Sequence, residues 1–186
     1  MLREGAIKAH VPTGNQEKEF SCGAAALKVV FQYFKVGPHS EAEIRKLVKS
    51  KPNTGTRTQN IIAACKKYGL KTKARYNMDR HELEAWLDKK KPVIVCLQAW
   101  GTPERYKSKT SGHYVVAIGY DEKNVYFQDP LMKDKVRGHI PWDEFIKRWR
   151  DSDADGNLRT RYGIAIWKDG VQTRASEVVK KSKKIK

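Results

Sequence analysis

Apolar residues in the N-terminal part of the chain recur at the three- and four-residue spacing that is typical of amphipathic helices. Three helices are predicted there, at 22–34, about 41–48 and about 59–68. Ser21 and Ser40 precede the first two at the N-cap position, and Gly69 follows the third at the usual C-terminal position. We therefore expect this part of the chain to be helical.

The pattern changes after Lys91-Pro92, where continuous apolar runs replace the helical spacing. Strands are predicted at 70–76, 93–97, 112–120, 125–129, 136–140 and 162–167. Two shorter helices are expected at 79–89 and 141–149. The links between the later strands are too short for crossover helices, so these strands are expected to pair antiparallel. The predicted fold class is α+β, with N-terminal helices packed on a C-terminal antiparallel sheet.

The composition is compatible with one globular domain, because 39% of the 186 residues are hydrophobic. We expect that domain at 1–168 and a basic, flexible tail at 169–186. The longest apolar runs, such as Val93–Leu97, are too short to cross a bilayer, and the first residues lack the apolar core of a signal peptide. The three cysteines follow no disulfide framework or zinc spacing, which fits reduced thiols. A cytoplasmic protein without a transmembrane segment is therefore predicted.

The formal net charge of +17 makes nucleic acid an alternative partner. However, the lysines and arginines are spread along helices and loops, as on a solvated surface, and no recognised nucleic-acid motif accompanies them. Nucleic-acid binding would predict a strongly salt-sensitive affinity. No nucleic-acid partner is expected.

Cys22 stands at the predicted start of the first helix, followed by Gly23 and three alanines. A thiol in the first turn faces unpaired backbone N–H groups and the positive end of the helix dipole, and both favour the reactive thiolate. The small residues leave room for another chain to approach the sulfur. The alternative is a small core cysteine, which is common for a free thiol. We expect that state for Cys65 and Cys96.

A histidine and an aspartate mark one end of a predicted hairpin. His113 opens the strand at 112–120, and Asp129 closes the strand that follows the loop Asp121–Asn124. Because the two strands would pair antiparallel, both side chains fall at the same end of the hairpin. A thiolate nucleophile needs a base, and the base needs a third group that holds its tautomer. Cys22, His113 and Asp129 can supply these three roles.

Three motifs together resemble those of the bacteriocin-processing peptidases. They are Gln16 with the run Ser21–Ala25, the strand opening Gly112–Val116, and the strand ending Gln128–Pro130. The resemblance spans about residues 10–167. Members of that family are papain-like cysteine peptidases that cut leader peptides after a double glycine, and they are often fused to a membrane transporter.

The resemblance implies a role for each matching residue. Cys22 would be the nucleophile, His113 the general base and acid, Asp129 the group that orients the histidine, and Gln16 the donor to the oxyanion. It also implies a peptide or protein substrate, cut after small residues such as Gly-Gly. A separate transporter is a candidate partner. No metal or other cofactor is expected.

The substrate is expected to pass between small residues and an aromatic side chain. Gly23 follows Cys22 and Gly112 precedes His113. Trp100 lies in the loop Ala99–Ser111 before His113. Two other functions use the same residues differently. A non-catalytic module would bind a leader peptide without cutting it, and an acyl-transferring relative would pass the acyl group to an amine instead of water.

The run from Asp151 to Gly156 begins like a calcium-binding EF-hand loop. The twelfth position from Asp151 is Tyr162 instead of glutamate, so the bidentate ligand is missing. An acidic surface loop is therefore favoured over a calcium site.

Overall fold

The computed structural model describes residues 6–152, 156–171 and 182–186. Within these residues the helices are α1 (Cys22–Phe34), α2 (Glu41–Leu47), α3 (Thr58–Lys67), α4 (Arg80–Asp88), α5 (Pro103–Lys107) and α6 (Trp142–Arg148). The strands are β1 (Lys71–Arg75), β2 (Val93–Gln98), β3 (Gly112–Tyr120), β4 (Asn124–Gln128), β5 (Arg137–Pro141), β6 (Arg150–Ser152), β7 (Leu158–Thr160), β8 (Gly163–Trp167) and β9 (Ser182–Lys184). Every predicted helix and strand is present to within a few residues. None of the helices in these ranges has the length and apolar character that crossing a membrane requires.

Seven of the described strands form one sheet, in the order β1-β8-β2-β3-β4-β5-β9. Each neighbouring pair is antiparallel except β5 and β9. The strands β2 to β5 follow one another through the sheet, whereas β8 returns to pair between β1 and β2. The predicted α+β class with an antiparallel sheet is therefore confirmed. A separate hairpin of β6 and β7 was not expected.

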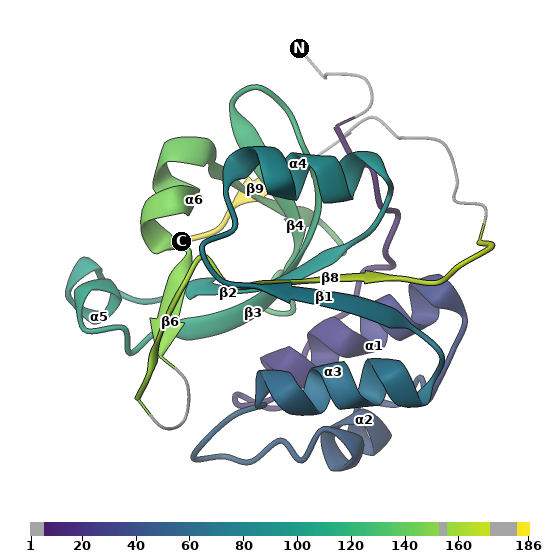
Figure 1. Ribbon diagram of the computed structural model, residues 1–186. Coiled ribbons are helices and arrows are strands. Elements are labelled where there is room, and N and C mark those ends of the chain that lie inside the picture. The colour runs from purple at the N-terminus through teal and green to yellow at the C-terminus, as the bar shows by residue number, and fades with distance from the viewer. Residues whose placement is uncertain (1–5, 153–155, 172–181) are drawn as a thin grey trace.

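Helices cover both faces of the sheet, with α1, α2 and α3 on one side and α4 and α6 on the other (Figure 1). Side chains alternate between the two faces along each strand. In β2, for example, Ile94 and Cys96 join the core under α1, whereas Val93, Val95 and Leu97 join the core under α4 and α6. The continuous apolar run predicted as a buried strand is thus buried on both faces.

The extended segment before α1 crosses the middle of the sheet. Ile7 pairs with Gly119 in an isolated antiparallel bridge. A Cβ at Gly119 would lie 1.9 Å from the carbonyl oxygen of Ala6, so only glycine permits this crossing. Farther along, the backbone N–H of Gln16 donates to the carbonyl oxygen of Pro130 at 3.0 Å. The segment therefore runs past the end of β4 before it turns into α1.

The C-terminal tail differs from its prediction. Residues 172–181 lie outside the described part of the chain, but Ser182–Lys184 form β9 alongside β5, and the side chain of Ile185 is buried. The prediction of a flexible tail is therefore wrong for 182–186. An isolated isoleucine in a lysine-rich run gives no periodic signal, so composition alone did not reveal its place in the core. The domain boundary at 168/169 stays a prediction.

Ser21 and Ser40 are the N-cap residues of α1 and α2, as predicted, but among the described residues neither caps its helix through its side chain. By contrast, Asp79 caps α4, since its carboxylate accepts the backbone N–H of Glu82 at 2.8 Å. The hydroxyl of Ser21 is used for another contact, described below.

Candidate active site

Cys22 is the first residue of α1, and its half-buried side chain lines a recess of about 370 Å³. The first N–H groups of a helix have no acceptor within the helix, and the helix dipole places a partial positive charge there. The start of α1 therefore offers donors and a positive field beside the sulfur. The helix is fixed on the sheet by its buried face, which includes Leu27, Val30, Phe31 and Phe34.

His113 and Asp129 form a buried pair at one end of the hairpin of β3 and β4. The antiparallel register places Val116 opposite Gln128, which brings the start of β3 beside the residue that follows β4. The Nε2 atom of His113 lies 2.6 Å from Oδ1 of Asp129, and the two side chains are 6% and 0% exposed. The hairpin argument from the sequence thus predicted a contact that the structure contains.

The Asp129 carboxylate is held by further donors. The backbone N–H of Leu131 donates to Oδ1 at 2.8 Å, and the indole N–H of Trp100 donates to Oδ2 at 2.9 Å. Trp100 was predicted to line a substrate groove. In the structure its ring nitrogen points to Asp129, while the residue stays 37% exposed. Contact between Trp100 and a substrate therefore stays a prediction, and its bond to Asp129 is a role that the sequence did not reveal.

The Cys22 thiol lies close enough to the ring of His113 to affect the pKa of that ring. Burial opposes a charge on this ring and by itself would lower its pKa. The charge of Asp129 and the hydrogen bond to it, together with the influence of Cys22, outweigh burial and raise the pKa of His113 to about 10. The imidazole is therefore protonated at neutral pH. Because Nε2 is engaged by Asp129, Nδ1 is the ring nitrogen left to face the sulfur.

Gln16 lies on the loop that leads into α1, but its amide is turned into that loop. The amide nitrogen donates to the carbonyl oxygens of Lys18 and Glu19, at 2.8 Å and 3.1 Å. The amide oxygen is buried, and among the described residues it has no hydrogen-bond partner. An amide has two N–H donors. To bind an oxyanion, the Gln16 amide would therefore have to break one of its hydrogen bonds to the carbonyl oxygens of Lys18 and Glu19.

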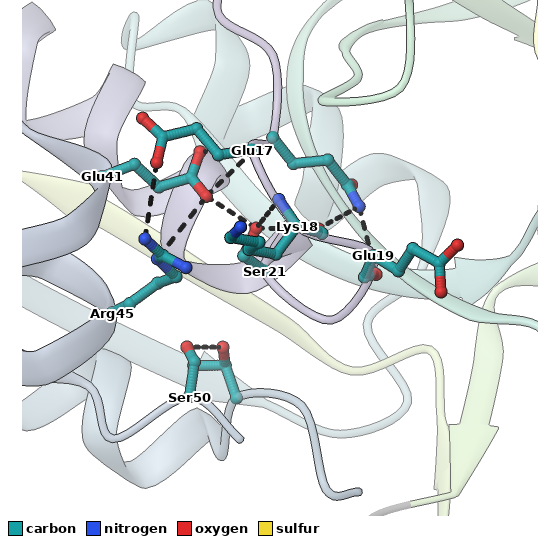
Figure 2. A network of polar contacts seen from close by, with 9 residues as sticks. Glu17, Lys18, Glu19, Ser21, Glu41, Arg45 and Ser50 are labelled. Atoms are coloured by element: carbon teal, nitrogen blue, oxygen red, sulfur yellow. Dashed lines mark hydrogen bonds and ion pairs between the residues drawn. The ribbon is translucent and has the colours of Figure 1, made fainter. Parts of the chain in front are cut away.

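Glu41, the first residue of α2, has a fully buried carboxylate that was not among the predicted site residues. The two carboxylate oxygens accept the backbone N–H of Glu17, each at 3.0 Å, and one accepts the Ser21 hydroxyl at 2.6 Å (Figure 2). Arg45, one turn along α2, lies 3.9 Å from the same carboxylate. These contacts tie the turn before the nucleophile to α2. A glutamate at a helix start is normally exposed to solvent, where it interacts with the helix dipole, so no local pattern indicates that Glu41 is buried.

Removing this carboxylate is expected to destabilise the turn that carries Cys22. Glu41→Ala would leave the Glu17 N–H without its acceptor, and Arg45 would keep Glu17 as a carboxylate partner but lose Glu41, at a cost of about 1–3 kcal/mol in the free energy of unfolding. Glu43→Ala, at an exposed position on the same helix, is the matched control and should change stability by less than about 0.5 kcal/mol. Urea unfolding of both variants measures the difference. Equal stabilities would show that the network contributes nothing.

The recess beside Cys22 lies between the loop after α2, the start of β3 and the β6–β7 hairpin, and it includes Asp151 and Arg159. The two predicted substrate-contacting glycines have packing partners in the protein itself. A Cβ at Gly23 would lie 2.7 Å from the side chain of Thr56. A Cβ at Gly112 would lie 2.4 Å from the Asp151 carboxylate. Both glycines therefore allow close packing around the recess, and their contact with a substrate stays a prediction.

Asp151 points into the fold. Its carboxylate accepts the side-chain N–H of Gln98 at 3.0 Å and the thiol of Cys96 at 2.9 Å, and burial raises its pKa. Asp153 and Asp155, which complete the calcium-like run, lie outside the described residues. Within the described residues no group of three or more side chains is placed to hold a metal ion. Asp151 thus stabilises the side of the recess through its bonds to Gln98 and Cys96.

The other two cysteines have the environment expected of core thiols. Both are buried, as the sequence predicted. Burial raises the pKa of Cys65 to about 12 and the pKa of Cys96 well above its usual value. Both thiols therefore stay protonated, and unreactive, at neutral pH.

Solved structures share this fold. A double glycine motif protease from the AMS/PCAT transporter, in complex with the leader peptide, is 24% identical with a TM-score of 0.59, covering 89% of this chain and 97% of that chain. The peptidase domain of Streptococcus ComA, a bifunctional ABC transporter, is 22% identical with a TM-score of 0.63, covering 86% and 100%. A C39-like peptidase from Bacillus anthracis is 17% identical with a TM-score of 0.66, covering 92% and 100%. No curated protein matches the chain.

The fold is therefore that of the papain-like double-glycine peptidase domains, as the resemblance implied. The sequence gives an independent comparison. Residues 8–155 match the model of the peptidase C39-like family, and this range includes Gln16, Cys22, His113 and Asp129. The match covers most of the 186 residues. The chain belongs to the peptidase C39-like family.

Proposed function

We propose that the chain is a cysteine peptidase in which Cys22 is the nucleophile, His113 the general acid and base, and Asp129 the group that orients the imidazole. The observation that carries the proposal is the buried His113–Asp129 pair, 2.6 Å apart, with the Cys22 thiol close enough to the same ring to raise its pKa. Nucleophilic catalysis needs such an arrangement of nucleophile, base and orienting group. The family and the fold support the same class of reaction.

The reaction starts from a thiolate and an imidazolium. The sulfur adds to the substrate carbonyl carbon. The resulting oxyanion accepts hydrogen bonds from the Cys22 backbone N–H and the Gln16 amide, and each bond lowers the barrier by about 3–4 kcal/mol. His113 gives its proton to the leaving amine as the C–N bond breaks, which leaves a thioester on Cys22. Water then attacks the thioester and loses a proton to His113. The acid product leaves, and the thiolate and imidazolium are restored.

The proposed substrate is a peptide or protein cut after small residues such as Gly-Gly. The double-glycine protease bound to a leader peptide, among the solved structures with this fold, supports that choice. A separate transporter is the proposed partner, and the cytoplasm is the proposed compartment. Transfer of the acyl group to an amine would use the same thioester and differs only in the nucleophile that attacks it.

A peptide-directed thiol probe tests the proposal. A chloromethyl ketone that carries a Gly-Gly sequence is expected to alkylate Cys22 in preference to Cys65 and Cys96. Cys22 is the half-buried thiol beside His113, whereas Cys65 and Cys96 are buried and burial raises their pKa, although Cys96 borders the same recess. Mass spectrometry of the digested protein locates the label. A Gly-Gly leader peptide incubated with the untreated protein should yield two fragments, and pretreatment with the probe should prevent this. Labelling of Cys65 or Cys96 with Cys22 unmodified would contradict the proposal.

A further inference from the structure

The last described segment, 182–186, lies outside the part of the chain that matches the family, 8–155. It is nevertheless built into the sheet. Its strand β9 is parallel to β5, and the Ile185 N–H donates to the carbonyl oxygen of His139 at 3.0 Å. The Ile185 side chain is 0% exposed and packs so closely on Gly138 that a Cβ there would lie 2.6 Å from it. The segment is thus an integral part of this fold.

Arg148, the last residue of α6, hydrogen-bonds both to the segment and to the end of β2. Its buried guanidinium donates to the carbonyl oxygens of Ile185 and Lys186, at 3.2 Å and 2.8 Å. The Nε atom of the same group donates to the carbonyl oxygen of Gln98, the last residue of β2, at 2.7 Å. One side chain therefore joins the C-terminal segment to the strand end that leads to Trp100.

Trp100 connects the C-terminal segment to the His113–Asp129 pair. Its backbone N–H donates to the carbonyl oxygen of Lys186 at 2.7 Å, and its φ of 58° lies in the left-handed region, which is costly for a non-glycine residue. Its indole N–H donates to Asp129 at 2.9 Å. A strained backbone conformation persists only where its surroundings hold it. The bond from Trp100 to Lys186 is such a support, two contacts away from His113.

We propose that the segment 182–186 is a positioning element for the active site, which acts through Trp100 to hold the Asp129 carboxylate in the orientation that His113 requires. The proposal rests on the proposed peptidase function for its kinetic consequence. Without the segment, the Trp100 backbone loses its acceptor, the indole N–H leaves Asp129, and the carboxylate is free to turn. Small errors in the position of a catalytic group cost rate more than substrate binding.

A double-mutant cycle tests this coupling. Deletion of residues 182–186 in the full chain is expected to lower kcat about 10-fold and to leave KM within about twofold, since misplacement alone is known to cost up to about 100-fold. In a Trp100→Phe background, which already lacks the indole N–H, the same deletion should lower kcat less than about twofold further. Equal losses in the two backgrounds would overturn the proposal.

Loss of stability is controlled with two isoleucine variants. Ile185→Ala loosens the segment, whereas Ile166→Ala removes an equally buried side chain from the opposite face of the sheet. At a temperature where both variants are folded, only Ile185→Ala should lower kcat in the wild-type background and fail to do so in the Trp100→Phe background. An equal fall of kcat in Ile166→Ala would show that the effect is general destabilisation.

A readout that needs no substrate separates this proposal from the proposed function. The ring N–H of His113 that faces Asp129 should give a strongly downfield proton resonance, and deletion of 182–186 should shift or broaden it. An unchanged resonance would overturn the positioning role. If the resonance responds to the deletion while the wild-type protein cleaves no peptide, the coupling stands and the peptidase function fails.

Discussion

Replacement of Cys22 with alanine is expected to abolish peptide cleavage while peptide binding persists. Alanine removes the only atom that can form the thioester, and loss of the nucleophile in a catalytic triad lowers kcat on the order of 10⁶-fold. Because the side chain is only half-buried and alanine suits a helix, the fold should survive the change. Cleavage of a Gly-Gly leader peptide, followed by mass spectrometry, measures the loss. Calorimetry with the same peptide measures binding.

Cys65→Ala is the matched control, because it removes a second thiol on a helix of the same layer. It should cleave the peptide at a rate within about twofold of wild type. Its free energy of unfolding should fall by about 1 kcal/mol. Full cleavage by Cys22→Ala would eliminate the proposed nucleophile. If the wild-type protein binds the leader peptide and does not cut it, the non-catalytic binding module is the correct function.

Asp129→Asn is expected to produce the second largest effect. The amide keeps the shape of the side chain but loses the charge that sustains the imidazolium, and it presents an uncharged acceptor to Nε2. Impaired acid–base chemistry should lower kcat/KM about 10²–10⁴-fold. The pH profile should change as well, since the Asp129 charge is the largest influence that raises the pKa of His113.

The direction of the pH shift follows from the protonation states. The pKa of His113 is about 10, so the imidazolium that pairs with the thiolate exists below that pH and is lost as the pH rises through it. Wild-type kcat/KM should therefore fall on an alkaline limb near pH 10. In Asp129→Asn the opposing effect of burial remains, the pKa of His113 falls, and the limb moves to lower pH.

Asp143→Asn is the control for the pH profile, because this carboxylate is exposed at the start of α6. Its alkaline limb should coincide with that of the wild-type protein. A rate profile measured from pH 5 to 11 compares the three proteins. An alkaline limb that stays in place in Asp129→Asn would show that the carboxylate does not control the charge of His113.

Local patterns in the sequence were sufficient to predict the hairpin that carries the site. The strand of β3, the short loop and the strand of β4 are each visible as apolar runs with turn residues between them. Antiparallel pairing then follows from the length of the loop, and the proximity of His113 and Asp129 follows from the pairing. Cys22 at the start of a helix is predicted in the same way. These inferences succeeded because each depends on contacts between neighbours along the chain.

Three features of the site could not be predicted in this way. Glu41 is buried because α2 packs over the turn before α1, and no pattern within α2 indicates that turn. Trp100 reaches Asp129 because β2 and β4 end at the same edge of the sheet, on either side of β3, and no local pattern in the sequence indicates that contact. The C-terminal segment was expected to be flexible because it is rich in lysine, yet one isoleucine and several backbone carbonyls fix 182–186.

The sequence by itself determined the α+β class, the order of the elements and the residues capable of thiol chemistry, because periodicity, turn residues and side-chain reactivity are local properties. Only the tertiary structure decided that the Cys22 thiol meets the His113 ring and that Glu41 and Trp100 support the two sides of the site. It also decided that the Gln16 amide faces its own loop. These contacts join segments far apart in the chain, and their geometry depends on how the cores pack.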